Sequence, residues 1–159
     1  MKHHFGAVVV GLGPAGMSAA IALAESGVKT AVIDDQPTAG GQVYRQPPDQ
    51  FRNASLKPAW GPHATGARLM ARLKQTDRGI TIFPRASIFG YFSDNEIAVV
   101  QDDELLDIGF HKLIICEGAM ERTIPFPGWT LPGIMTSGGM QRLLKQQGVL
   151  VGQRILLAG

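Results

Sequence analysis

The sequence predicts an α/β fold in which a parallel sheet, flanked by helices, is combined with an antiparallel β-meander. Two observations predict it. Residues 5–34 show a strand, a glycine-rich turn, a helix and a second strand, which is the order of a βαβ unit. Residues 86–110 show short strand patterns separated by Asp and Asn turn signals, which indicates a meander.

The composition excludes several classes of protein. The 159 residues fit one ordinary domain, and 45% hydrophobic against 18% charged residues predicts a packed core rather than disorder. A net charge of +2 makes nucleic acid an improbable default partner. One cysteine, Cys116, excludes an internal disulfide framework, a C-x-x-C redox pair and a thiolate zinc cluster. We predict no metal site.

The N-terminal apolar run 7–24 could be mistaken for an export signal. Glycines and a proline interrupt it, whereas a signal or membrane helix would be continuous. The run is better explained as a β-branched strand over 7–10 followed by an alanine-rich helix over 14–24, with Pro14 in its first turn and Gly27 after its end. We therefore expect a cytoplasmic protein without a membrane span.

The remaining elements follow from local patterns. Apolar runs of strand length alternate with turn residues, and residues 64–74 and 140–147 have helical spacing of apolar side chains. The long Pro- and Gly-containing stretch 36–62 predicts a functional loop. The predicted strands cover residues 30–33, 80–83, 87–92, 97–101, 105–110, 112–116 and 154–159.

One motif carries the chemistry. Residues 11–16 read G-L-G-P-A-G, between a strand and a helix, and the next strand ends on an acidic residue. In such a turn Gly11 permits the tight bend, Gly13 lets a pyrophosphate approach the backbone, and Gly16 lets the helix pack on the strand. The helix N-terminus would hold the phosphates, and Asp34 would accept hydrogen bonds from a ribose.

Residues 11–20, G-L-G-P-A-G-M-S-A-A, resemble the FAD fingerprint of the two-dinucleotide-domain flavoproteins, the pyridine nucleotide-disulfide oxidoreductase superfamily. The G-G-Q at 40–42 resembles the loop that comes near the flavin in thioredoxin-reductase-like members. The segment 121–133, E-R-T-I-P-F-P-G-W-T-L-P-G, with V-Y-R at 43–45, is similar to one branch. Its members are the FAD subunits of opine oxidases, of hydrogen cyanide synthase and of D-hydroxyproline or sarcosine-type dehydrogenases.

The resemblance implies a Rossmann-like FAD/NAD(P)-binding fold of which this sequence is the N-terminal portion. Residues 1–124 would form the FAD-binding part, and 125–159 the crossover and the truncated start of a second nucleotide-binding domain. FAD is the implied cofactor, and NAD(P) would bind only in that missing domain. The implied cofactor-binding residues are Gly11, Gly13, Pro14, Ala15, Gly16, Asp34, Asp35, Gly41, Gln42, Arg45, Ala86 and Gly118.

The resemblance also implies a reaction, the oxidation of a secondary amine or amino acid by hydride transfer to the flavin. No catalytic side chain is identified. The implied partners are the amine substrate and companion subunits of a dehydrogenase complex. Two alternatives stay open: a non-catalytic nucleotide-binding or electron-relay subunit, and a truncated fragment that does not hold FAD.

A few other residues have two interpretations. His3 and His4 are expected to form a disordered, solvated pair near the terminus. Arg45 could face flavin or substrate, or be a solvated loop residue. Arg122 is expected to pair with the neighbouring Glu121 rather than to bind phosphate.

Overall fold

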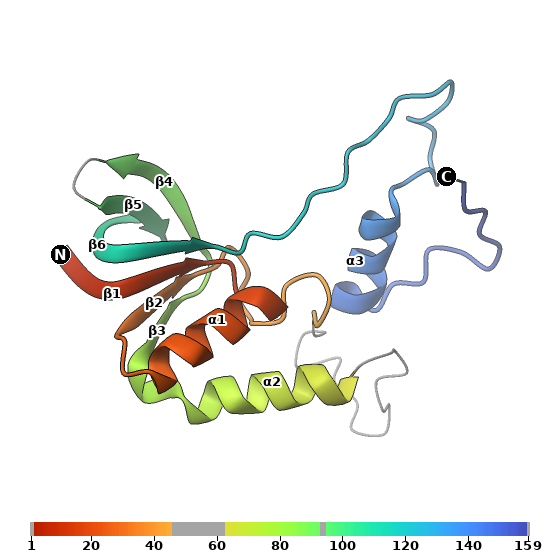
Figure 1. The fold of residues 1–159 in the computed structure, drawn as a ribbon. Helices are drawn as coiled ribbons and strands as arrows, with labels where there is room; N and C mark the ends of the chain where they lie inside the picture. Colours follow the sequence, from red (N-terminus) through yellow and green to blue (C-terminus); the bar gives the residue numbers. More distant parts are fainter. Residues whose placement is uncertain (1, 46–62, 93–94, 159) are drawn as a thin grey trace. The chain divides into compact units, whose positions relative to one another are not determined.

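The computed structural model describes residues 2–45, 63–92 and 95–158 (Figure 1). Most of the predicted loop 36–62 therefore lies outside the described residues. The chain divides into two compact units, one formed by residues 1–44 and 60–118, the other by residues 45–59 and 119–159. Each unit is described by itself.

The first unit contains a six-stranded sheet in the order β3-β2-β1-β6-β5-β4. Strands β1, β2 and β3 are parallel, β6 is parallel to β1, and β4, β5 and β6 form the antiparallel meander. The α/β fold with a parallel sheet and a meander is thus confirmed. The described elements are β1 (Lys2–Val10), α1 (Pro14–Glu25), β2 (Thr30–Ile33), α2 (His63–Gln75), the short 3-10 helix η2 (Asp77–Gly79), β3 (Ile80–Phe83), β4 (Ala86–Phe92), β5 (Glu96–Gln101) and β6 (Glu104–Ile115).

The α-helices α1 and α2 cover the same face of the parallel strands (Figure 1). The buried side chains between them and the sheet come from β1, β2, the turn after β1 and these two helices, and Met17 and Ala20 of α1 are fully buried. The alanine-rich sequence of α1 lets it approach the sheet closely. The cluster consists of Val9, Leu12, Met17, Ala20, Ile21, Val32 and Leu73.

A second core lies on the opposite face and draws residues from all six strands. Since these strands belong to one sheet, the sheet must curve so that the meander packs over the parallel strands. A backbone hydrogen bond of 2.9 Å from Ala86 to the carbonyl of Asp34 joins the start of β4 to the end of β2. The cluster consists of Phe5, Val8, Ala31, Ile33, Phe83, Ala86, Ile97, Val99, Ile108 and Phe110.

Two predicted strands, 105–110 and 112–116, are one continuous strand, β6. The prediction had placed a break at His111, between these two strands. Instead, β6 pairs with β5 up to Gly109 and with β1 up to Ile115, so one long strand joins the meander to the parallel sheet. The polar side chains at 111 and 112 are exposed, which explains why they do not interrupt it.

The expectation of disorder at His3 and His4 is wrong, because both lie in β1, which begins at Lys2. The ring of His4 lies edge-on to that of His111, with 4.8 Å between the centroids. A Cβ at Gly109 would lie 2.9 Å from the His4 ring, so the glycine leaves room for the imidazole. The parallel pairing with β6 supplies the partners that the terminal sequence alone did not reveal.

In the second unit, α3 (Ser137–Gln147) is capped at both ends. The hydroxyl of Thr136 accepts from the backbone of Gly139 at 3.1 Å, and Gly148 closes the helix in the left-handed region with φ +66°. The Glu121 carboxylate accepts from the Ser137 hydroxyl at 2.7 Å and from the Gly138 backbone at 2.8 Å. Glu121 therefore stabilises the first turn of α3.

Two expectations for this unit are not met. The pairing of Glu121 with Arg122 is replaced by the contacts of Glu121 with the N-terminus of α3. The predicted strand at 154–159 has no strand conformation at the described positions 154–158. A β-strand needs a neighbouring strand for its backbone hydrogen bonds, and the described part of this unit contains none.

Candidate functional site

The glycine turn lies between β1 and α1, at the carboxyl edge of the parallel strands. Gly11 has φ +92°, and a Cβ on it would collide with the carbonyl of Cys116, which follows β6. A Cβ on Gly16 would collide with the carbonyl of Gly11, so α1 begins directly against the turn. Both positions require glycine for the reasons that the motif predicts.

Gly13 differs from these two glycines because it borders open space. The only described heavy atom near a Cβ on Gly13 would be the Cα of Gly41, at 3.8 Å. Gly13 is the N-cap of α1, Pro14 is the first helical residue, and no described side chain caps the helix. The backbone N–H groups of Ala15 and Gly16 in the first turn thus lie at the positive end of the helix dipole, where an anionic group fits.

Asp34 follows β2 and is buried, with 8% of its surface exposed. Its Oδ2 accepts a hydrogen bond from the backbone of Leu12 in the glycine turn, and its Oδ1 accepts one of 2.7 Å from the backbone of Gln36. Asp34 therefore fixes the turn to the end of β2. Its neighbour Asp35 is exposed. The sequence analysis assigned Asp34 to the ribose and did not predict this structural role.

The segment 40–44 packs directly on the glycine turn. Gly40 donates a backbone hydrogen bond of 2.9 Å to the carbonyl of Leu12. A Cβ on Gly41 would lie only 2.7 Å from the Cα of Gly13. Both Gly40 and Gly41 have positive φ, +127° and +56°. The side chain of Gln42, the last residue of the G-G-Q sequence, is exposed.

The structure brings most predicted site residues to one edge of the sheet. The turn residues, Asp34 and Gly41 are connected by the contacts above. The backbone N–H of Ala86 donates a hydrogen bond to the carbonyl of Asp34. Gly118 follows β6 and has φ +80°. A Cβ on Gly118 would have no described atom within 4 Å. Arg45 belongs to the second unit, where its Nη1 donates to Oε1 of Gln146 at 3.3 Å.

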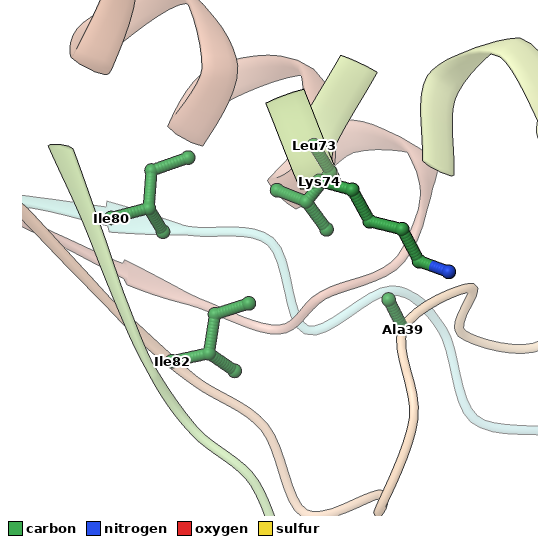
Figure 2. A pocket seen from close by; sticks show the side chains of 5 residues that line it. All are labelled: Ala39, Leu73, Lys74, Ile80 and Ile82. Atoms are coloured by element: carbon green, nitrogen blue, oxygen red, sulfur yellow. The ribbon is translucent and has the colours of Figure 1, made fainter. Parts of the chain in front are cut away.

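One described hollow lies on the helix side of the sheet, between α2 and the edge strand β3 (Figure 2). Its volume is about 380 Å³ and its lining is almost entirely apolar, from Ala39, Leu73, Lys74, Ile80 and Ile82. This lining lacks the hydrogen-bonding groups that a dinucleotide requires. Within the described ranges there is no cluster of three metal-ligating side chains and no helix long and apolar enough to cross a membrane.

A βαβ unit with an open helix N-terminus at a glycine turn defines a dinucleotide-binding domain of the Rossmann class. Residues 5–156 match the family model described as pyridine nucleotide-disulphide oxidoreductase. The chain belongs to this family, which consists of FAD-dependent oxidoreductases.

Curated relatives support the branch that the sequence resembles. The chain is 35% identical over 153 residues to the A subunit of opine oxidase from Rhizobium meliloti and 34% identical over 155 residues to the HcnB subunit of hydrogen cyanide synthase from Pseudomonas protegens. Both matches cover 96% of this chain but only 33% and 32% of the relatives. The alpha subunit of sarcosine oxidase from a Corynebacterium is 28% identical over 170 residues, a match that covers 98% of this chain and 17% of that subunit. The chain thus spans about a third of the first two relatives.

Solved structures show the same fold. L-proline dehydrogenase from P. horikoshii matches with a TM-score of 0.73 and 21% identity over 96% of this chain and 30% of its own. A thioredoxin reductase from Gloeobacter violaceus matches with a TM-score of 0.52 and 27% identity over 80% of this chain and 41% of its own. The Rossmann-like fold is thereby confirmed.

Proposed function

We propose that this chain is the N-terminal FAD-binding portion of an oxidoreductase that oxidises a secondary amine or amino acid, such as an opine or hydroxyproline. The observation that carries the proposal is the start of α1 at Gly13, where no described side chain caps the helix and a Cβ would meet no described atom closer than the Cα of Gly41 at 3.8 Å. An anionic pyrophosphate is the group that such a space accommodates best, since it interacts with unpaired N–H groups and the helix dipole.

Most of the predicted site residues would contact the cofactor in this proposal. The backbone of Gly13, Ala15 and Gly16 would bind the pyrophosphate. The ribose would bind Asp35 in preference to Asp34, because the Asp34 carboxylate already accepts two backbone hydrogen bonds and is buried, whereas Asp35 is exposed.

The other predicted residues would contact the two ends of the cofactor. The backbone near Ala86 and Gly118 would lie by the adenosine, and Gln42 would lie nearer the isoalloxazine. Arg45 would face flavin or substrate if it leaves Gln146. A bound flavin supplies the hydride acceptor for a C–H bond next to an amine nitrogen, and the chain supplies binding and orientation.

The relatives support the proposed substrate class. Opines and sarcosine, which name two of the relatives, both contain a secondary amine nitrogen next to a C–H bond. Those relatives are also named as subunits, so we propose that companion subunits work together with this chain. An NAD(P) site, if the protein has one, would belong to a second domain.

The visible absorption spectrum tests FAD binding. The purified chain is incubated with excess FAD, desalted and scanned, and we expect a retained flavin band. Gly13→Asp should abolish the band by placing a carboxylate in the pyrophosphate space. Ala22→Asp is the matched control, because it adds the same charge at an exposed position of the same helix. A flavin band that survives Gly13→Asp unchanged would contradict the proposed site.

Bleaching of the flavin by candidate amines tests the reaction in the full-length protein. Bleaching by an opine or another secondary amine, with the protein alone, supports the proposed activity. Bleaching only in the presence of a companion protein favours the electron-relay alternative. A chain that retains no flavin at all favours the alternative of a fragment without cofactor.

A further inference from the structure

We infer that Tyr44 is a positioning residue for the proposed dinucleotide site. Its ring connects helix α2 to the segment 40–44, which in turn borders the space at Gly13. This inference rests on the proposed FAD binding. Every residue in the argument belongs to the first unit, so it uses contacts within one compact body.

The first contact is between Tyr44 and α2. A Cβ on Gly66 would lie 2.6 Å from Cδ1 of the Tyr44 ring and 2.9 Å from its Cγ and Cε1. The ring therefore lies directly on the backbone of α2, where a Cβ at position 66 would have to displace it. Met70 lies one turn further along the same face of α2, and its Cε would be 3.0 Å from a Cβ on Gly40.

The second set of contacts joins Tyr44 to the glycine turn. The backbone N–H of Tyr44 donates to the carbonyl of Gly40 at 2.9 Å, and the N–H of Gly40 donates to the carbonyl of Leu12 at 2.9 Å. Gly41, between these two, is in contact with Gly13. Two backbone hydrogen bonds thus connect Tyr44, through Gly40, to Leu12, the residue before Gly13.

Gly41 borders the proposed pyrophosphate space, and we infer that its position depends on the Tyr44 ring, which lies outside that space. Gly41 is the described neighbour of the open position at Gly13. Because a close-packed interior transmits displacements, the segment 40–44 keeps its place only while the Tyr44 ring fills the gap over Gly66. Loss of the ring releases the segment and widens the space that should fit a pyrophosphate.

Titration of FAD into the 159-residue chain tests the inference, with Tyr44→Leu and Tyr44→Phe as variants. We expect Tyr44→Leu to weaken FAD binding by about tenfold, within the usual range of coupling between sites. Tyr44→Phe keeps the ring and should bind FAD with the affinity of the parent chain. Gly66→Ala should weaken binding similarly by displacing the ring. Tyr91→Leu is the control, since Tyr91 lies on β4 and is 60% exposed.

Amide hydrogen exchange without FAD gives the independent readout. The N–H groups of Gly40 and Tyr44 should exchange faster in Tyr44→Leu and Gly66→Ala than in the parent, while those of β1 stay protected. If the parent chain binds FAD and Tyr44→Leu binds it equally well, the inference is overturned and the proposed function stands. If the parent chain does not bind FAD, the proposed function fails and the positioning role fails with it.

Discussion

Gly41 and Gly13 meet backbone to backbone, so closely that a Cβ on Gly41 would lie 2.7 Å from the Cα of Gly13. These residues belong to two separate glycine sequences, the turn at 11–16 and the G-G-Q at 40–42. Their contact brings the two sequences together at the start of α1. The turn at 11–16 leads into the N-terminus of α1. Gly41 of the G-G-Q lies beside that N-terminus and has no side chain that would fill the proposed pyrophosphate space.

Gly41→Ala should therefore be strongly destabilising. The left-handed backbone at φ +56° costs an alanine roughly 1–2 kcal/mol. The methyl group against the Gly13 backbone adds about 1–3 kcal/mol of overpacking. Thermal unfolding of the chain measures the sum.

Gly27→Ala is the matched control for this measurement. Gly27 also has a positive φ, +78°, but nothing lies within 4 Å of its would-be Cβ. It should show the conformational cost alone, roughly 1–2 kcal/mol. Equal losses at the two positions would mean that the contact with Gly13 contributes nothing.

The two acidic residues after β2 should separate stability from cofactor binding. Asp34→Asn removes the charge that accepts from Leu12 and Gln36, and should cost about 2 kcal/mol of the free energy of unfolding. Asp35→Asn alters an exposed side chain and should change stability by less than about 0.5 kcal/mol.

For the exposed Asp35, we expect the substitution to change FAD affinity rather than stability. Asp35→Asn should weaken FAD binding if its carboxylate holds the ribose, while thermal unfolding without FAD stays unchanged. Urea unfolding and FAD titration of both variants test the pair. A stable Asp34→Asn that loses only FAD affinity would reverse the two assignments and return the ribose to Asp34.

The sequence was sufficient for the features that depend on neighbouring residues. The βαβ unit, the meander and the glycine turn follow from short patterns, and the roles of Gly11 and Gly16 agree with the motif. The contact of Gly66 with Tyr44 was not predictable, because it joins positions far apart in sequence whose meeting depends on the placement of α2.

Burial and strand pairing set the other limits of prediction. Whether Asp34 or Asp35 turns inward depends on the position of the Leu12 N–H, which local sequence does not specify. Residues 154–158 have a strand-like sequence without strand conformation, since β propensity needs a pairing partner. The long β6 is the converse case, in which pairing with β1 continues past two polar residues beyond the end of the pairing with β5.

Glu121 should make the first turn of α3 sensitive to acid. Hydrogen bonds from the hydroxyls of Thr136 and Ser137, and from the backbone of Gly138, lower the pKa of this carboxyl below its ordinary value. Its folded-state pKa thus lies below its unfolded value, so its contribution is fully present above the ordinary pKa of a glutamate. That contribution is lost as the pH falls through the lowered pKa.

An NMR titration of the Glu121 carboxyl carbon measures this pKa directly. Ser137→Ala is the diagnostic variant, because it removes one donor, at 2.7 Å, and should raise the pKa of Glu121 toward its ordinary value. The backbone N–H of Gly138 should lose protection from hydrogen exchange over the same acidic range, since it donates to Glu121 at 2.8 Å. In Glu121→Gln that exchange should follow no carboxyl titration, because the amide accepts a hydrogen bond at every pH. Titration of Glu121 at its ordinary value, unmoved by Ser137→Ala, would show that the carboxylate does not hold the start of α3 in solution.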